Sequence, residues 1–344
     1  MNVETKPFGK IGGKRVHLFA WGREDGLRVT ATNYGCVITG MTFPDRRGTS
    51  EQVVLGHDTL EEYARDPYYL GGVIGRVAGR IRGGSFELNG RTCELARNDG
   101  PHHLHGGPRG LDKVVWDARI LDDGVEFRYL SPDGEEHYPG NVRITVTYRI
   151  RDDRELEIRY RAETDESTPL ALTNHTYFNL SGNAKRDILD HRLTLKSRRF
   201  LELDPELIPT GRLLDAEGTA FDFSKGRVIR DGTVSDHPQN RLAGGGYDHP
   251  FLLDEHHAGE IVLFDPESGR RLTIETDEPA VVVYTGNFLK EGGRFRGVPS
   301  RKHLGVCLET QACPDAVHHP HFPSVVLHPG ETYDSVTRYR FSCG

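Results

Sequence analysis

The sequence VRITVTYRI at residues 142–150 decides the fold class, because it alternates apolar and polar side chains over its whole length. Successive side chains of a β-strand point to opposite faces of a sheet, so this pattern predicts a strand with one buried face. The sequence LEIRYRA at 156–162 repeats the alternation, and the polar residues 151–154 predict a turn between the two segments. Together the segments predict an antiparallel hairpin.

Other segments carry the same hairpin pattern. An Asn-Gly pair at 89–90, a combination that tolerates the positive φ angles of a tight turn, separates the strand-like runs 86–88 and 92–95. Further strand-like runs lie at 118–121, 125–129, 261–264, 271–274 and 332–342. Only residues 59–63 have the pattern of a short capped helix. We therefore expect an all-β protein, a large antiparallel β-sandwich formed by residues 1–344 as a single domain.

Composition and charge exclude several classes of protein. The 344-residue chain has a formal net charge of -7 and scattered Lys and Arg residues, so we expect no nucleic-acid partner. No apolar run approaches the roughly 18 residues of a membrane-spanning helix, so we expect no membrane partner. Residues 1–10 lack the apolar stretch of a signal peptide, and the cysteine count of 5 is odd. These features predict a cytoplasmic protein with free thiols. They do not give the oligomeric state, for which we expect a monomer or a homodimer.

The histidines are unevenly distributed, with close groups at 102–105 and 318–321 among a total of 17. His103 and His105 are two residues apart and would project from one face of a strand, a spacing that metal ligands use on β scaffolds. The alternative is a loop whose histidines make ordinary hydrogen bonds. No neighbouring carboxylate completes an obvious set of ligands.

Two residues have the surroundings of an acid–base pair. Glu309 follows the strand-like run 305–308, and a carboxylate at the end of a buried strand is a catalytic group or a salt-bridge partner. His175 lies in the sequence TNHTYFN at 173–179, where hydrogen-bonding and aromatic side chains suit either a polar ring-shaped ligand or a buried core position. General acid–base chemistry requires such a carboxylate and histidine to meet in one pocket.

Arg80 and Asp248 are candidates for binding residues. Arg80 closes the sequence GRVAGRI at 75–81, and an arginine between small and apolar neighbours often makes fixed, multidentate hydrogen bonds. The segment is no phosphate loop, because it lacks the Gly-Lys-Ser/Thr ending. Asp248 follows a glycine-rich segment at 244–246, so we expect it on a flexible loop, as a ligand-binding carboxylate or as a turn cap.

Taken in order, these motifs resemble those of the aldose 1-epimerase (galactose mutarotase) family. The similar strings extend over nearly the whole chain: TNYG (32–35), VVLG (53–56), GRVAGRI (75–81), LHGG (104–107), TNHTYFNL (173–180), GYDH (246–249), YTGNFL (284–289), LETQ (308–311) and PDA (314–316). The resemblance implies a β-supersandwich with an open sugar-binding cleft, an isomerase that acts on a monosaccharide such as glucose or galactose, and no metal or other cofactor.

The same resemblance implies roles for individual residues. The Glu of the LETQ motif would be the general base, Glu309, and the His of the TNH motif would be the general acid, His175. The family motifs further imply that Arg80, His105 and Asp248 bind the sugar.

The sequence departs from the family pattern at two positions. Gly79 stands where animal galactose mutarotases have Asn, and Val282 stands where they have Gln, so the chain lacks two side chains that could bond sugar hydroxyls. The preferred aldose therefore does not follow from the resemblance.

Three alternatives remain open from the sequence. The first is a non-catalytic sugar-binding or regulatory protein of the same fold. The second is an epimerase of a sugar phosphate, for which the basic residues Arg294, Arg296, Arg301 and Lys302 would bind the phosphate. The third is a metal-dependent hydrolase or dioxygenase that uses the histidine groups.

Overall fold

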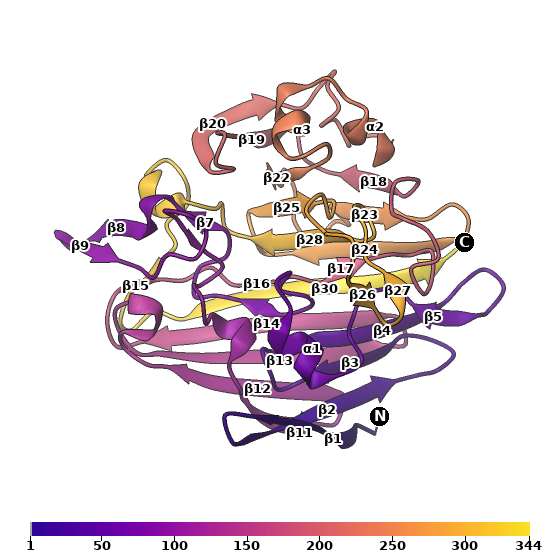
Figure 1. Cartoon of the computed structure of the whole chain (residues 1–344), viewed down its shortest axis with the longest axis horizontal. Coiled ribbons are helices and arrows are strands. Elements are labelled where there is room, and N and C mark those ends of the chain that lie inside the picture. Colours follow the sequence, from indigo (N-terminus) through magenta and orange to yellow (C-terminus); the bar gives the residue numbers. More distant parts are fainter. Residues whose placement is uncertain (1) are drawn as a thin grey trace.

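The computed structural model describes residues 2–344, and antiparallel strands dominate it (Figure 1). A nine-stranded sheet has the order β11 (Asp117–Leu121), β12 (Gly124–Ser131), β13 (Val142–Asp152), β14 (Glu155–Thr164), β30 (Tyr333–Cys343), β24 (Arg270–Thr276), β23 (Ile261–Phe264), β18 (Arg192–Leu195) and β21 (Arg227–Val228). A six-stranded sheet has the order β17 (Tyr177–Phe178), β28 (Val306–Gln311), β25 (Ala280–Tyr284), β22 (Asp248–Leu252), β19 (Arg199–Leu203) and β20 (Pro209–Asp215). The antiparallel all-β architecture confirms the predicted fold class.

Smaller sheets complete the strand architecture. A five-stranded sheet runs in chain order: β1 (Glu4–Ile11), β2 (Lys14–Gly22), β3 (Arg28–Thr32), β4 (Ile38–Pro44) and β5 (Ser50–Gln52). Two-stranded pairs are β6 (Val73–Ile74) with β16 (Thr173–Asn174), β7 (Arg80–Ile81) with β10 (His103–Leu104), β8 (Ser85–Leu88) with β9 (Arg91–Glu94), β15 (Thr168–Pro169) with β29 (Val326–Leu327), and β26 (Arg294–Phe295) with β27 (Val298–Pro299).

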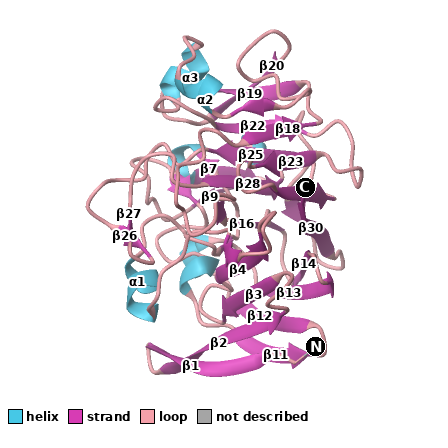
Figure 2. Cartoon of the chain, turned by 90° about the vertical axis from the view of Figure 1, so that its right-hand side faces the viewer, coloured by secondary structure: helices cyan, strands magenta, loops and turns pink. Residues whose placement is uncertain are grey.

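Helices are few and short, and they lie toward the face from which Figure 1 is viewed, at the left of Figure 2. They are α1 (Leu60–Arg65), α2 (Arg230–Thr233) and α3 (Pro238–Leu242). Thr59 caps α1 in a reciprocal capping box with Glu62, as the sequence predicts. Single 3₁₀ turns occur at Arg82–Gly84, Leu111–Lys113, Glu135–His137 and Ala316–His318. Among residues 2–344, no helix is long and apolar enough to cross a membrane.

The hairpin predicted from the alternating sequence is confirmed as β13 and β14. Val146 lies opposite Tyr160 in the register, and both side chains are buried. The turn is tighter than predicted, because Asp152 still pairs with Glu155. The hairpins β8–β9, β11–β12 and β23–β24 and the strand β30 are also confirmed.

The three large sheets share an apolar core. Trp21 of β2, Val146 of β13 and Val283 of β25 are fully buried members of this core, although they come from three different sheets. Burial of apolar surface stabilises such packing by about 25 cal/mol per Å². The resulting rigid framework holds the six-stranded sheet in place, and one face of that sheet forms the floor of a cleft.

Strand periodicity divides the six-stranded sheet into a core face and a cleft face. In β28, Val306 and Leu308 belong to the apolar core, whereas Glu309 and Gln311 line the cleft. In β25, the core residues Val281 and Val283 flank Val282, which lines the cleft. Because successive side chains alternate between faces, each strand contributes both to the core and to the site.

Candidate active site

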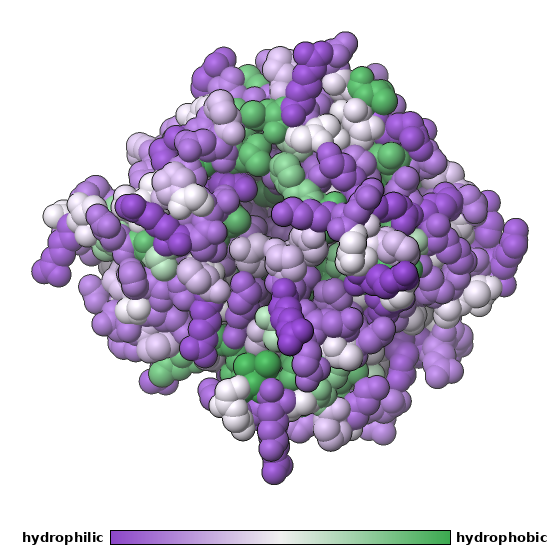
Figure 3. Space-filling model, viewed as in Figure 1, coloured by the Kyte–Doolittle hydropathy of each residue, from purple (hydrophilic) through white to green (hydrophobic). Residues whose placement is uncertain are grey.

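The cleft has a volume of about 470 Å³ and opens on the face shown in Figure 3, where hydrophobic side chains border a hollow. Two kinds of side chain meet in it. Polar groups come from β7, β22 and β28 and from segments beside the strands, such as His105 after β10 and His175 after β16. Apolar groups include Leu203 of β19, Pro209 of β20, Pro250 of β22 and Val282 of β25. A cleft lined by both polar and apolar groups suits a sugar, whose hydroxyls and C–H groups need different partners.

Glu309 and His175 form the centre of the cleft. The Oε1 atom of Glu309 lies 3.7 Å from Nε2 of His175, and the two side chains are 3% and 5% exposed. His175 follows directly after β16, and Glu309 lies inside β28, which pairs with β25. The sequence placed Glu309 at the end of a strand, and this expectation is wrong: the strand continues to Gln311, because Thr310 and Gln311 still pair with Val281 and Ala280.

Burial controls the protonation of this pair. Loss of solvent raises the pKa of Glu309 well above its usual range, and the nearby Asp248 carboxylate raises it further, whereas Arg80 lowers it. Loss of solvent also lowers the pKa of His175 to about 4. Both shifts favour uncharged groups.

His105 is the third polar group at this point of the cleft. Its ring centroid lies 5.3 Å from that of His175, with the two ring planes perpendicular. The backbone N–H of Gly79 donates a hydrogen bond of 3.1 Å to Nδ1 of His105. Burial lowers the pKa of His105 well below its usual value, so the ring is neutral and its proton lies on Nε2. His105 is therefore a hydrogen-bond donor at neutral pH.

The three side chains of Glu309, His175 and His105 also lie close enough together to be considered as metal ligands, with one ligand atom each within 4.8 Å of the others. A metal-bound histidine needs a free nitrogen lone pair. The Nδ1 lone pair of His105 already accepts the Gly79 N–H, and its Nε2 carries the ring proton. The hydrogen bonding of His105 therefore fits a sugar hydroxyl and does not fit a cation.

Arg80 lines the cleft from β7 and is held by Asp99. The Nε atom of Arg80 donates a hydrogen bond of 2.7 Å to Oδ2 of Asp99, which leaves the terminal nitrogens of the guanidinium for other partners. The other arginine of the GRVAGRI sequence has a structural role: Arg76 is buried and donates to Ser131 and to the backbone carbonyls of Pro132 and Pro139.

Asp248 lines the cleft as the first residue of β22, where it pairs with Tyr284 of β25. The expectation of a flexible loop is therefore wrong, because five residues of β22 pair with β25 and fix this carboxylate in the sheet. Burial raises the pKa of Asp248 to about 6, and Arg80 opposes the shift. The group is thus close to its midpoint of titration in mildly acidic solution.

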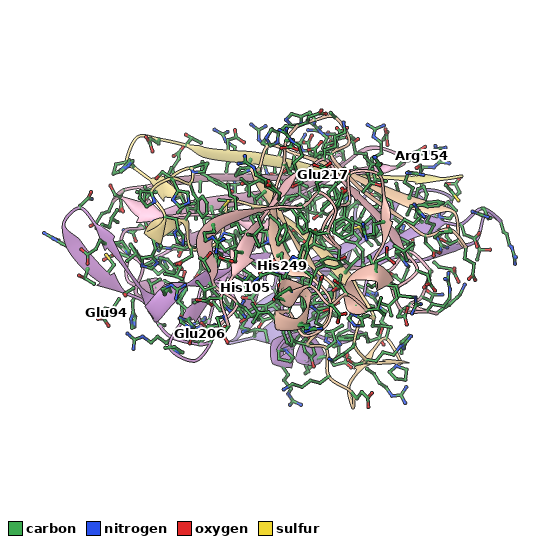
Figure 4. All side chains as sticks on the ribbon, turned by 90° about the horizontal axis from the view of Figure 1, so that it is seen from above. Glu94, His105, Arg154, Glu206, Glu217 and His249 are labelled. Atoms are coloured by element: carbon green, nitrogen blue, oxygen red, sulfur yellow. The ribbon has the colours of Figure 1, made fainter. Side chains whose placement is uncertain are left out.

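Other sequence candidates lie outside the cleft. His103 does not share a cleft-facing strand with His105, because Nε2 of His103 bonds the hydroxyl of Tyr138 and Nδ1 bonds the backbone oxygen of Ala96. His319 and His321 bond the backbone oxygens of Pro209 and Gly211. Figure 4 shows His105 toward the middle of the molecule and Glu94, from the neighbouring hairpin, at its edge.

The basic group proposed for a phosphate also lies away from the cleft lining. Arg294, Arg296 and Arg301 donate to the backbone oxygens of Gly297, Thr39 and Pro299, and Lys302 lies against the carbonyl of Gly244. None of the four lines the cleft in the described part of the chain. The structure therefore does not bring the basic group proposed for a phosphate to the cleft.

Sequence reasoning missed three residues of the site. Asp99 fixes Arg80, the ring of Tyr69 lies 4.7 Å from that of His105, and Sγ of Cys307 lies 3.5 Å from Nδ1 of His175. Only Cys307 had a usable signal, since it stands two residues before Glu309 and so shares its face of β28. The contacts of Asp99 and Tyr69 arise from loops that no local pattern predicts.

The antiparallel sheets and their polar cleft define a β protein of the galactose mutarotase type. Residues 17–340 match the family model described as aldose 1-epimerase. The galactose mutarotase of Bos taurus is 46% identical over 327 residues, covering 93% of this chain and 92% of its own length. The aldose 1-epimerase of Escherichia coli (strain K12) is 35% identical and covers 96% of both chains.

Solved structures of aldose epimerases are also similar to this chain. The galactose 1-epimerase of Lactobacillus acidophilus has a TM-score of 0.89 and 29% sequence identity, with 100% of this chain and 99% of that chain covered. The epimerase homologue of C. elegans has a TM-score of 0.87 and 30% sequence identity, with 93% of this chain and 97% of that chain covered. The chain belongs to the aldose 1-epimerase family and is an isomerase of the mutarotase kind.

Proposed function

We propose that this chain interconverts the α and β anomers of a free aldohexose such as glucose or galactose, with Glu309 as general base and His175 as general acid. The observation that carries the proposal is the 3.7 Å separation of the two groups on the cleft floor. The anomeric hydroxyl and the ring oxygen of a pyranose are bonded to the same carbon. A base for one oxygen and an acid for the other must therefore lie close together.

The reaction moves two protons and breaks one bond. Glu309 takes the proton of the anomeric hydroxyl, and His175 gives a proton to the ring oxygen as the bond from that oxygen to the anomeric carbon breaks. The electron pair of the hydroxyl oxygen forms the carbonyl of the open-chain aldehyde. Rotation about the adjacent carbon–carbon bond presents the other face of the carbonyl, and the ring closes with the two roles reversed.

The pKa shifts of the pair agree with this proton movement. Ring opening starts from a carboxylate and an imidazolium and ends with a carboxylic acid and a neutral imidazole. The final state is the one that burial favours in the cleft, since burial raises the pKa of Glu309 and lowers that of His175. The pair carries one proton throughout, so the reaction needs no exchange with solvent between opening and closing.

The remaining polar groups would bind the sugar. Arg80, which lowers the pKa of Glu309, stabilises the carboxylate form needed at the start. His105 donates through Nε2, and Asp248 accepts from hydroxyls, so the site offers both kinds of partner. Gly79 and Val282 line the cleft without a polar side chain, and we expect sugar hydroxyls near them to be bound less strongly.

Polarimetry tests the proposal. Freshly dissolved α-D-glucose and α-D-galactose are followed with the protein, with the Glu309→Gln variant and without protein, because sugars mutarotate spontaneously. We expect the protein to accelerate the change in optical rotation of at least one sugar and the variant to lose the acceleration. Tight binding of both sugars with no acceleration would refute the catalytic proposal.

A further inference from the structure

His249 is a fully buried histidine of the six-stranded sheet that the mechanism above does not use. It is the second residue of β22, directly after Asp248, and it lies toward the middle of the molecule (Figure 4). Because successive side chains of a strand point to opposite faces, His249 points away from the cleft that Asp248 lines. A buried imidazole that is out of reach of the sugar needs hydrogen-bond partners within the protein.

Both ring nitrogens of His249 have such a partner. The backbone N–H of Asp248 donates a hydrogen bond of 3.1 Å to Nδ1, and Nε2 lies 3.1 Å from Oε1 of Gln239 in α3. The amide of Gln239 also bonds the backbone of Leu203 in β19. Its Oε1 accepts the Leu203 N–H at 2.8 Å, and its Nε2 donates to the Leu203 carbonyl at 2.9 Å. A continuous chain of hydrogen bonds therefore leads from Asp248 to Leu203.

The donors and acceptors of this chain have only one consistent arrangement. The N–H and the carbonyl of Leu203 fix which end of the Gln239 amide is the oxygen. An amide oxygen only accepts, so Nε2 of His249 carries the ring proton, and Nδ1 keeps the lone pair that the Asp248 N–H needs. Burial lowers the pKa of His249 to about 3, which agrees with a neutral ring.

The chain lies where the sheet lacks strand pairing. In the described part of the chain, β19 pairs with β22 at residues 199–200, opposite residues 251–252, and the ladder ends there. The next residue of β22 toward the cleft is Pro250, which has no backbone N–H to contribute to a ladder. The Gln239 amide offers Leu203 the donor and the acceptor that a paired strand would offer. It thereby joins β19 to β22 through the ring of His249.

We propose that Gln239 and His249 are positioning residues for the sugar-binding carboxylate of Asp248, and that they set the affinity of the cleft for the aldose. This inference rests on the proposed function, because it assigns the two residues a task in the binding of the same sugar.

Asp248 needs this support because of its place in the chain. It is the first residue of β22, and residues 244–246 just before it are glycines, which restrain the backbone little. Pairing with Tyr284 of β25 holds Asp248 on one side. The ring of His249 binds its backbone N–H, and the Gln239 amide fixes that ring. Loss of either side chain would free the start of the strand and leave a buried donor without a partner.

The protonation of Asp248 reports whether the carboxylate keeps its place. Burial is the main cause that raises its pKa to about 6. The other titratable and charged groups that face Asp248 are Arg80, Asp99, Tyr284, Cys307, Glu309 and the neutral ring of His249. If the start of β22 loosens, water reaches the carboxylate, and its pKa falls toward the usual value of about 3.9. The pH at which KM changes with the charge of Asp248 would then move downward.

The test compares Gln239→Met, His249→Phe and the double variant with the wild type by polarimetry over a range of pH. Both substitutions keep most of the buried volume and remove the hydrogen bonds. We expect each single variant to raise KM about 10-fold at similar kcat, a typical cost of removing a residue that orients a ligand-binding group. The midpoint of the pH dependence of KM should move below 6. Because both residues act through one chain, the double variant should raise KM no further than the larger single effect.

His191→Phe is the matched control. His191 is also a fully buried histidine that accepts a backbone N–H, that of Leu180 at 2.9 Å, but it does not line the cleft. This variant should lower Tm and leave KM and its pH dependence unchanged. An equal rise of KM in His191→Phe would overturn the proposal. A wild-type KM in Gln239→Met, an unmoved midpoint, or additive effects in the double variant would also overturn it.

A measurement on the wild type alone covers the case in which the variants do not fold. The ¹⁵N shifts of the His249 ring, assigned through the backbone of the isotope-labelled protein, report which nitrogen carries the proton. We expect the proton on Nε2, and a proton on Nδ1 would overturn the proposal. Mutarotation by the wild type together with any of these negative results would leave the proposed function standing. No mutarotation of any aldose would remove the proposed function and this inference with it.

Discussion

Replacement of Glu309 by Gln removes the general base at almost constant volume. The side chain of Glu309 is 3% exposed. Among residues 2–344 it is the one carboxylate within ion-pair distance of His175. A positioned base contributes about 10²–10⁴-fold to a rate, or roughly 2.7–5.4 kcal/mol. Because no second carboxylate lies at this distance from His175, we expect the upper half of that range, a fall in kcat of about 1,000-fold or more.

The same variant should be more stable than the wild type. The pKa of Glu309 is raised in the folded protein, so the folded state binds more protons than the unfolded chain between the unfolded and folded pKa values. The free energy of unfolding of the wild type therefore decreases as pH rises through that window. Glutamine does not ionise, so the variant does not lose unfolding free energy in this way as pH rises. The Tm of Glu309→Gln should exceed that of the wild type by a large margin near neutral pH. This margin should shrink as the pH is lowered toward the usual pKa of glutamate, about 4.3.

Polarimetry of mutarotation and thermal unfolding monitored by circular dichroism measure the two effects. Glu278→Gln is the matched control, because Glu278 is also buried, also has a raised pKa and accepts a hydrogen bond from Tyr333 outside the cleft. It should leave kcat unchanged. A Glu309→Gln variant with kcat within tenfold of the wild type would refute the assignment of the base. A variant that is less stable than the wild type at neutral pH would refute the argument from burial.

Three further predictions concern the other groups of the cleft. His175→Asn should lower kcat at least about 100-fold in polarimetry while sugar binding persists in calorimetry, and a smaller loss would exclude His175 as the acid. With the pKa of Asp248 at about 6, the carboxylate form accepts sugar hydroxyls above that pH, so KM should fall as pH rises through about 6. Asp248→Asn should abolish this dependence at similar kcat, and a KM that is independent of pH in the wild type would contradict the role. Val282→Gln adds an amide to the cleft floor beside Glu309. One new hydrogen bond to a sugar hydroxyl should lower KM about 2- to 10-fold for glucose or galactose. An unchanged KM for both sugars would show that no hydroxyl lies near residue 282.

Part of the site could be predicted because its signals are local. The motifs around Glu309, His175, His105, Arg80 and Asp248 identified the five side chains, and the structure brings all of them to one cleft. Their secondary structure was harder to predict. The strand β22 begins at Asp248, two residues after the last of three consecutive glycines, because pairing with Tyr284 outweighs the weak local preference for extended structure.

The contacts that set the chemistry are long-range. His175 and Glu309 come from segments far apart in the chain, and the contact of His175 with Cys307 spans 132 residues. Arg80 is fixed by Asp99 in a loop, and His105 by the backbone of Gly79. No periodicity encodes such pairs, since each depends on the position of two separately folded segments.

The amino-acid sequence by itself determined the all-β architecture, the hairpins and the types of residue available for acid–base chemistry. These features follow from the two-residue period of strands and from turn residues, both of which act over a few neighbouring positions. Only the tertiary structure decided how far apart the acid and the base lie, which nitrogen of each histidine is a donor, and in which direction each pKa moves. Burial and hydrogen-bond partners set these properties, and both arise only when distant strands pack against one another.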